Sequence, residues 1–187
     1  MINLFSVPHT GTHFLKQLLE SAGLQVRARH WEGWSKTDQQ IVAPIRNPYD
    51  TFVSWVNRGR DQDFLEKWQI FNEAYETQDL LILPIDTNDR DKRLRTFSAE
   101  LGIKLDTDWT PVNQGNNQEI GFMDLSEVYN LPVVKQFYTQ RKPTRTEIEH
   151  TVRNILTEKY GAKFAPNLFK DSVNQIMEEM EESEYTV

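Results

Sequence analysis

Twice in its first third, the chain passes from a short apolar run through a turn into an amphipathic helix. Residues 2–7 form the first run, and Pro8 and Gly11 mark the turn that follows it. Residues 40–45 form the second run, and Pro48 suits the first position of the next helix. A strand that leads into a helix ends beside the helix's unbonded N–H groups and the positive end of its dipole. Each passage therefore predicts a site for a phosphate or a similar oxyanion.

The rest of the chain repeats this alternation of short apolar runs and helical patterns. After the first turn, apolar side chains recur with helical spacing at Phe14, Leu15, Leu18, Leu19 and Ala22, before Gly23. Further strands are predicted at 25–29 and 80–85, and further helices at 64–75, 90–101, 144–160 and 167–182. The alternation predicts a three-layer α/β/α fold, in which helices cover a central parallel sheet. Residues 106–121 are predicted to form a long polar connection.

In the second passage, helix formation explains most residues but not all of them. Asn47 is a good N-cap and Asp50 complements the helix dipole. The apolar stripe of this helix consists of Tyr49, Phe52, Val53 and Val56. Arg46 and Ser54 are not explained by packing, and a guanidinium beside a hydroxyl offers charged and neutral donors to one phosphate.

The two passages together resemble the sulfotransferases that use 3′-phosphoadenosine 5′-phosphosulfate (PAPS). In that family a Pro-Lys-x-Gly-Thr-like loop holds the 5′-phosphosulfate, and residues 8–14 follow it with His9 where lysine is usual. A second motif, Arg-x-Pro-x-Asp-x-x-x-Ser, holds the 3′-phosphate, and residues 46–54 follow it without a gap. The resemblance implies a compact member with the P-loop-like sulfotransferase fold. The donor-binding residues that it implies are Pro8, His9, Thr10, Gly11, Thr12, His13, Arg46 and Ser54.

Sulfuryl transfer also needs a group that takes a proton from the acceptor. The family often places His or Glu for this purpose between the two motifs, at the end of a strand, and His30 matches that position with Glu32 in reserve. An unperturbed imidazole titrates near pH 6.5, so neutral His30 could act as the general base. His9 could donate to the leaving oxygen when protonated, which requires that nearby phosphates raise its pKa. A structural role is the alternative for each histidine.

Other polar and aromatic residues near these motifs have weaker indications of function. Trp31 and Trp34 follow the proposed base and could wall an acceptor pocket, although loop tryptophans more often anchor a loop to the core. Arg141 and Lys142 could reach the 3′-phosphate, or they could be solvated charges.

Length and composition limit the remaining possibilities. The chain of 187 residues fits a single domain over 1–187, and it contains no cysteine for a disulfide or a thiolate metal site. A formal net charge of −7 argues against broad binding to nucleic acid or an anionic membrane. The sequence predicts no membrane span, and a cytoplasmic location is expected. The expected partners are the nucleotide donor, its product 3′-phosphoadenosine 5′-phosphate (PAP) and an unknown acceptor, with no metal.

Two alternatives to a sulfotransferase account for parts of the sequence. Asp86 follows an apolar strand and could hold Mg²⁺ in a phosphotransferase of the wider P-loop class. Residues 8–14, however, lack the Gly-Lys pair and the length of a Walker A loop. The other alternative is a nucleotide-binding or interaction module that keeps the fold but, with His9, has lost turnover.

Overall fold

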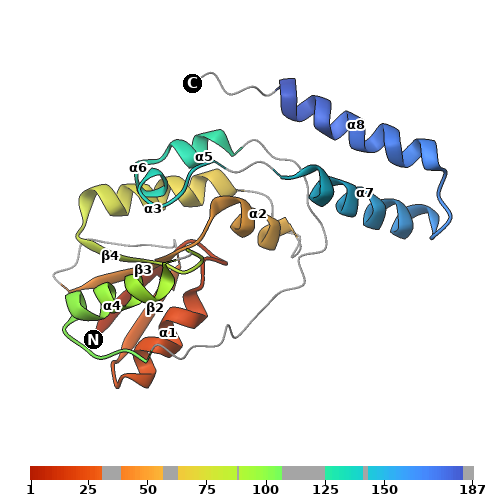
Figure 1. Ribbon diagram of the computed structural model, residues 1–187. Helices are drawn as coiled ribbons and strands as arrows, with labels where there is room; N and C mark the ends of the chain where they lie inside the picture. The colour runs from red at the N-terminus through yellow and green to blue at the C-terminus, as the bar shows by residue number, and fades with distance from the viewer. Residues whose placement is uncertain (31–38, 57–62, 88, 107–124, 141–142, 183–187) are drawn as a thin grey trace.

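The fold is built on a four-stranded, all-parallel sheet. The computed structural model describes residues 1–30, 39–56, 63–87, 89–106, 125–140 and 143–182 (Figure 1). The strands are β1 (Ile2–Ser6), β2 (Val26–His30), β3 (Ile41–Ile45) and β4 (Leu80–Pro84), and they lie in the order β2-β1-β3-β4. Helices flank this sheet, so the prediction of an α/β fold with a parallel sheet is confirmed.

Eight helices occur within the described ranges. They are α1 (Thr12–Ser21), α2 (Pro48–Val56), α3 (Phe64–Thr77), α4 (Arg90–Leu101), α5 (Ser126–Asn130), α6 (Pro132–Lys135), α7 (Arg145–Tyr160) and α8 (Pro166–Glu182). The sequence predicts six of them to within about two residues at either end. The prediction missed α5 and α6, because helices of five and four residues are too short to establish a helical period.

The strand order contains a reversal beside β1. The chain leaves β1 through α1 and returns as β2 on one side, whereas β3 lies on the other side of β1 and β4 lies beyond β3. Parallel β-strands joined in this way place the ends of β1 and β3 next to each other at a topological switch point. Ligands of open α/β sheets bind in the crevice at such a point. The two motif segments follow β1 and β3 directly, and so they meet there.

The two faces of the sheet carry separate hydrophobic clusters. Leu4 of β1 packs with buried leucines of α1 and with Leu94 and Phe97 of α4. The next residue, Phe5, belongs to the second cluster, which contains the buried side chains of α2, α3, α5 and α6. Because successive side chains of a strand point to opposite faces, both faces of the sheet are covered. In Figure 1, α2, α3, α5 and α6 lie above the sheet, and α1 lies on the opposite side.

The last two helices form an antiparallel pair with a core of its own. Ile148, Val152 and Leu156 of α7 pack with Val173 and Met180 of α8. Helix α7 begins in a capping box, in which the side chains of Thr144 and Glu147 each accept from the other's backbone N–H. The pair extends away from the sheet in Figure 1. No helix in the described ranges is long and apolar enough to cross a membrane.

Candidate functional site

The loop between β1 and α1 is a tight, internally bonded turn. The backbone N–H and the hydroxyl of Thr10 both donate to the carbonyl of Val7, at 3.3 and 2.6 Å. The hydroxyls of Ser6 and Thr12 lie 2.7 Å apart, which ties the end of the strand to the start of the helix. The side chains of Thr10 and Thr12 are buried, so they shape the loop from inside. Any contact of this pair with a ligand falls to the backbone N–H of Thr12, because the N–H of Thr10 already donates to Val7.

Two residues of this loop have left-handed backbone conformations. His9 has φ +67° and Gly11 has φ +99°. Gly11 is also the N-cap residue of α1, and no side chain caps the helix there. A Cβ atom at Gly11 would lie 2.4 Å from Cδ1 of Ile85, which follows β4. The helix therefore begins with N–H groups that no capping side chain occupies, as the sequence predicted, in a loop whose backbone packs tightly on Ile85.

The segment between β3 and α2 is held from three sides. The Asn47 side chain caps α2 by accepting from the N–H of Tyr49 at 3.0 Å, and it also accepts from the Tyr129 hydroxyl at 2.6 Å. The backbone N–H of Asn47 donates to Oδ2 of Asp86 at 2.8 Å. The predicted N-cap is confirmed. Asn47 is also where two other parts of the chain hold this segment: Tyr129 of α5 and Asp86, which lies just after β4.

The carboxylate of Asp86 joins this segment to Tyr138 through hydrogen bonds. Its second oxygen, Oδ1, accepts from the hydroxyl of Tyr138, which also lies 3.1 Å from the carbonyl oxygen of Ile45. Burial, followed by the charge and hydrogen bond of Asp86, raises the pKa of Tyr138 above its ordinary value, while Arg93 and Arg46 act in the opposite direction. Tyr138 therefore stays protonated as a donor. Both carboxylate oxygens of Asp86 accept hydrogen bonds from the protein, which accounts for the residue without a metal.

Residues 8–14 and 46–54 form the first and second half-sites, and Arg46 begins the second. It is half-buried, immediately after β3, and within the described residues its guanidinium has no hydrogen bond or ion pair. Ser54 is also half-buried, in the second turn of α2. The predicted stripe of this helix is confirmed for Tyr49, Phe52 and Val53, whereas the side chain of Val56 lies outside the described residues. A cation kept partly out of water without a partner is a ready receptor for a phosphate.

Trp55 links the two half-sites. The indole Nε1–H of this α2 residue donates to the carbonyl of Pro8, in the first loop, at 2.9 Å. The ring of Trp55 also lies edge-on to the His9 ring, with 6.3 Å between the centroids. Nothing in either motif predicts this contact, because its two residues lie 47 positions apart along the chain.

The other predicted site residues lie at the same edge of the sheet or outside the described chain. His30 ends β2, and its backbone is in register with Ser6 of β1, so it occurs at the carboxyl edge as predicted. His13 is exposed in the first turn of α1. Five residues with possible roles fall outside the described ranges: Trp31, Glu32, Trp34, Arg141 and Lys142. In the described residues, no three side chains of the metal-ligating types His, Cys, Asp and Glu gather in one place.

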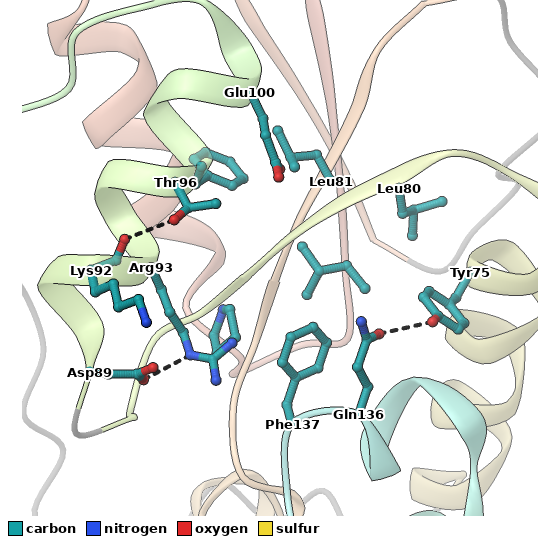
Figure 2. A pocket seen from close by; sticks show the side chains of 13 residues that line it. Tyr75, Leu80, Leu81, Asp89, Lys92, Arg93, Thr96, Glu100, Gln136 and Phe137 are labelled. Carbon is teal, nitrogen blue, oxygen red and sulfur yellow. Dashed lines mark hydrogen bonds and ion pairs between the residues drawn. The ribbon is translucent and has the colours of Figure 1, made fainter.

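A cavity of about 410 Å³ lies beside this site, along the outer edge of β4. Figure 2 shows Arg93 of α4 and Asp89, which precedes that helix, on one side of the strand, and Tyr75 and Gln136 on the other. Arg93 donates to Asp89 at 2.8 Å, and Tyr75 donates to Gln136 at 2.8 Å. None of the predicted donor-binding residues is among its described lining residues, so the cavity is separate from the two half-sites.

Comparison with known proteins gives no match. No family model, no curated protein and no solved structure matches the chain. The two motifs and the geometry around them are therefore the basis of the functional proposal.

Proposed function

We propose that the protein is a PAPS-dependent sulfotransferase with a P-loop-like sulfotransferase fold. The observation that carries the proposal is the meeting of two anion-receiving segments at the switch point between β1 and β3. Each segment matches one motif of the sulfotransferase family, and the two motifs occur in the family's order along the chain. Their spatial neighbourhood adds to the resemblance, because sequence order alone does not require the two segments to be close.

The two half-sites suit two different phosphates. At the start of α1, uncapped N–H groups and the helix dipole favour the 5′-phosphosulfate, with His9 and Gly11 shaping the loop. At the start of α2, the half-buried guanidinium of Arg46 and the hydroxyl of Ser54 suit the 3′-phosphate. The chain carries a formal net charge of −7, so these local donors must overcome a repulsive overall charge.

In the proposed reaction, a hydroxyl or amine of the acceptor attacks the sulfur of the donor. The new bond joins the acceptor to sulfur, the bond from sulfur to the bridging oxygen breaks, and PAP leaves with that oxygen. His30, at the carboxyl edge of β2, takes the acceptor's proton, with Glu32 as the reserve. His9, when protonated, donates toward the bridging oxygen.

Titration calorimetry with PAP and with ATP tests the donor site. Wild-type protein should bind PAP more tightly than ATP. Arg46→Ala should weaken PAP binding by roughly ten- to a hundredfold, because hydrogen bonds to charged groups contribute about 1.5–3 kcal/mol each. Ser54→Ala should cost less, because a neutral hydroxyl contributes about 0.5–1.5 kcal/mol.

Arg27→Ala is the matched control, since Arg27 is an exposed arginine on β2 without a hydrogen bond or ion pair among the described residues. It should leave PAP affinity unchanged. Equal affinity for PAP and ATP, or an Arg46→Ala protein that binds PAP as well as the wild type does, would show that the second segment is not a 3′-phosphate site.

A further inference from the structure

Trp55, the residue that follows the second motif segment, contacts the first motif segment directly. Its indole N–H bonds the Pro8 carbonyl at 2.9 Å, and its ring packs edge-on against the His9 ring. Trp55 is 4% exposed, so the indole itself is almost entirely out of water. Trp55 directly follows Ser54, which belongs to the other half-site.

The loop that Trp55 contacts has a conformation that local preferences do not favour. His9 is one of only two non-glycine residues with positive φ among those described. The left-handed region costs an L-residue roughly 1–2 kcal/mol. Such a conformation persists only where the surrounding structure determines it, and such residues cluster at functional sites. The hydrogen bond to Pro8 and the ring contact with His9 supply that restraint at two successive residues.

Trp55 is itself fixed by an aromatic row in the core. Its ring lies 5.1 Å from that of Phe64, and Phe64 in turn contacts Trp68 at 6.2 Å. These edge-to-face contacts hold the indole in one orientation, so its N–H has a defined direction. The restraint on the loop therefore comes from the core beneath α2.

We infer that Trp55 is a positioning residue, which holds the first loop in the conformation that receives the 5′-phosphate and ties that loop to the helix carrying Ser54. The inference rests on the proposed function for the identity of the anion. A protein in which this link is broken keeps its 3′-phosphate half-site and loses affinity at the 5′ half-site alone.

Trp55→Phe is the test variant, because phenylalanine keeps an aromatic ring against His9 and Phe64 while removing the N–H donor. Trp68→Phe is the matched control, since Trp68 is fully buried in the same row and its Nε1 has no hydrogen-bond partner among the described residues. Calorimetry with 5′-AMP and 3′-AMP then reads the two half-sites separately. Loss of one hydrogen bond should weaken 5′-AMP binding of Trp55→Phe by about three- to tenfold, with 3′-AMP binding changed by less than about twofold. Trp68→Phe should change neither by more than about twofold.

A second measurement needs no nucleotide. Backbone ¹⁵N relaxation of the free protein should show that residues 9–12 are more mobile in Trp55→Phe than in the wild type and in Trp68→Phe. Equal loss of 5′-AMP and 3′-AMP affinity, or unchanged mobility of the loop, would overturn the inference. If the wild type binds neither mononucleotide nor PAP, the proposed function fails, and the relaxation data still decide whether Trp55 positions the loop.

Discussion

Gly11 is the position at which a single methyl group tests the geometry of the first loop. Its φ of +99° lies in the left-handed region, and a Cβ atom there would lie 2.4 Å from Cδ1 of Ile85. We expect Gly11→Ala to destabilise the protein in two ways. The left-handed backbone costs alanine about 1–2 kcal/mol, and moving the end of the Ile85 side chain off its rotamer adds roughly 0.5–1.5 kcal/mol.

Two further variants separate these contributions. Gly102 is the C-cap of α4, with φ +67°, and a Cβ atom there would meet nothing within 4 Å, so Gly102→Ala should cost only the backbone part, about 1–2 kcal/mol. Ile85→Val removes the Cδ1 atom that clashes and by itself should cost about 0.5–1.5 kcal/mol. In the double variant with Gly11→Ala, the steric part should vanish, leaving a favourable coupling of about 0.5–1.5 kcal/mol.

Urea unfolding of the four proteins in the Gly11 and Ile85 cycle, with Gly102→Ala alongside, measures these free energies. The calorimetric affinity for PAP should fall in Gly11→Ala and stay unchanged in Gly102→Ala. Strict additivity of Gly11→Ala and Ile85→Val would refute the close approach of the loop to β4. A Gly11→Ala protein as stable as the wild type would also refute the left-handed turn.

Three further outcomes follow from the site. His30→Ala should lower turnover by about 10²–10⁴-fold while largely preserving PAP affinity, and a variant with full turnover would move the base to Glu32 or elsewhere. His9→Lys should keep or raise turnover and His9→Ala should lower it, and the wild-type rate should fall as pH rises through the His9 pKa; pH–rate curves that are identical in wild type and His9→Ala would reject its role as a proton donor. The pKa of Tyr138 is raised above its ordinary 10.0, so above that pH the unfolded chain releases a proton that the folded one keeps. The free energy of unfolding should therefore decline above about pH 10, with a smaller slope in Tyr138→Phe, as urea titrations at several pH values would show.

Local pattern was enough to predict most of the fold. A strand or helix that packs on a core repeats its apolar side chains at a fixed period, and α4 and α7 have caps that the sequence already contains, Gly102 and Thr144. Helices α5 and α6 were missed because they contribute a few buried side chains, such as Val128 and Val133, without completing a pattern. Their importance lies in what they bring to the site, namely Tyr129, and Tyr138 just beyond α6.

The predictability of the candidate site divides in a similar way. The parts proposed to bind anions are local, since each consists of a strand end and the helix that follows it, and the motifs therefore indicated them. The braces are long-range: Asp86 bonds Asn47 across 39 residues, and Trp55 bonds Pro8 across 47. From sequence, the place of Asp86 after an apolar strand allows a role as a metal ligand. Only the register of β3 and β4 shows that its carboxylate meets the N–H of Asn47.

The left-handed backbone of His9 gives a physical reason for histidine at the position where the sulfotransferase motif, which the loop resembles, has lysine. Among L-residues, histidine is enriched several-fold at positive φ together with Asn and Asp, and lysine is not. The imidazole ring also packs against Trp55, a contact that a flexible lysine chain would not reproduce with the same geometry. Histidine at this position thus suits the loop's conformation as well as its proposed chemistry. A lysine variant would exchange part of the loop's rigidity for a permanent charge, so its stability should fall while its turnover is kept or raised.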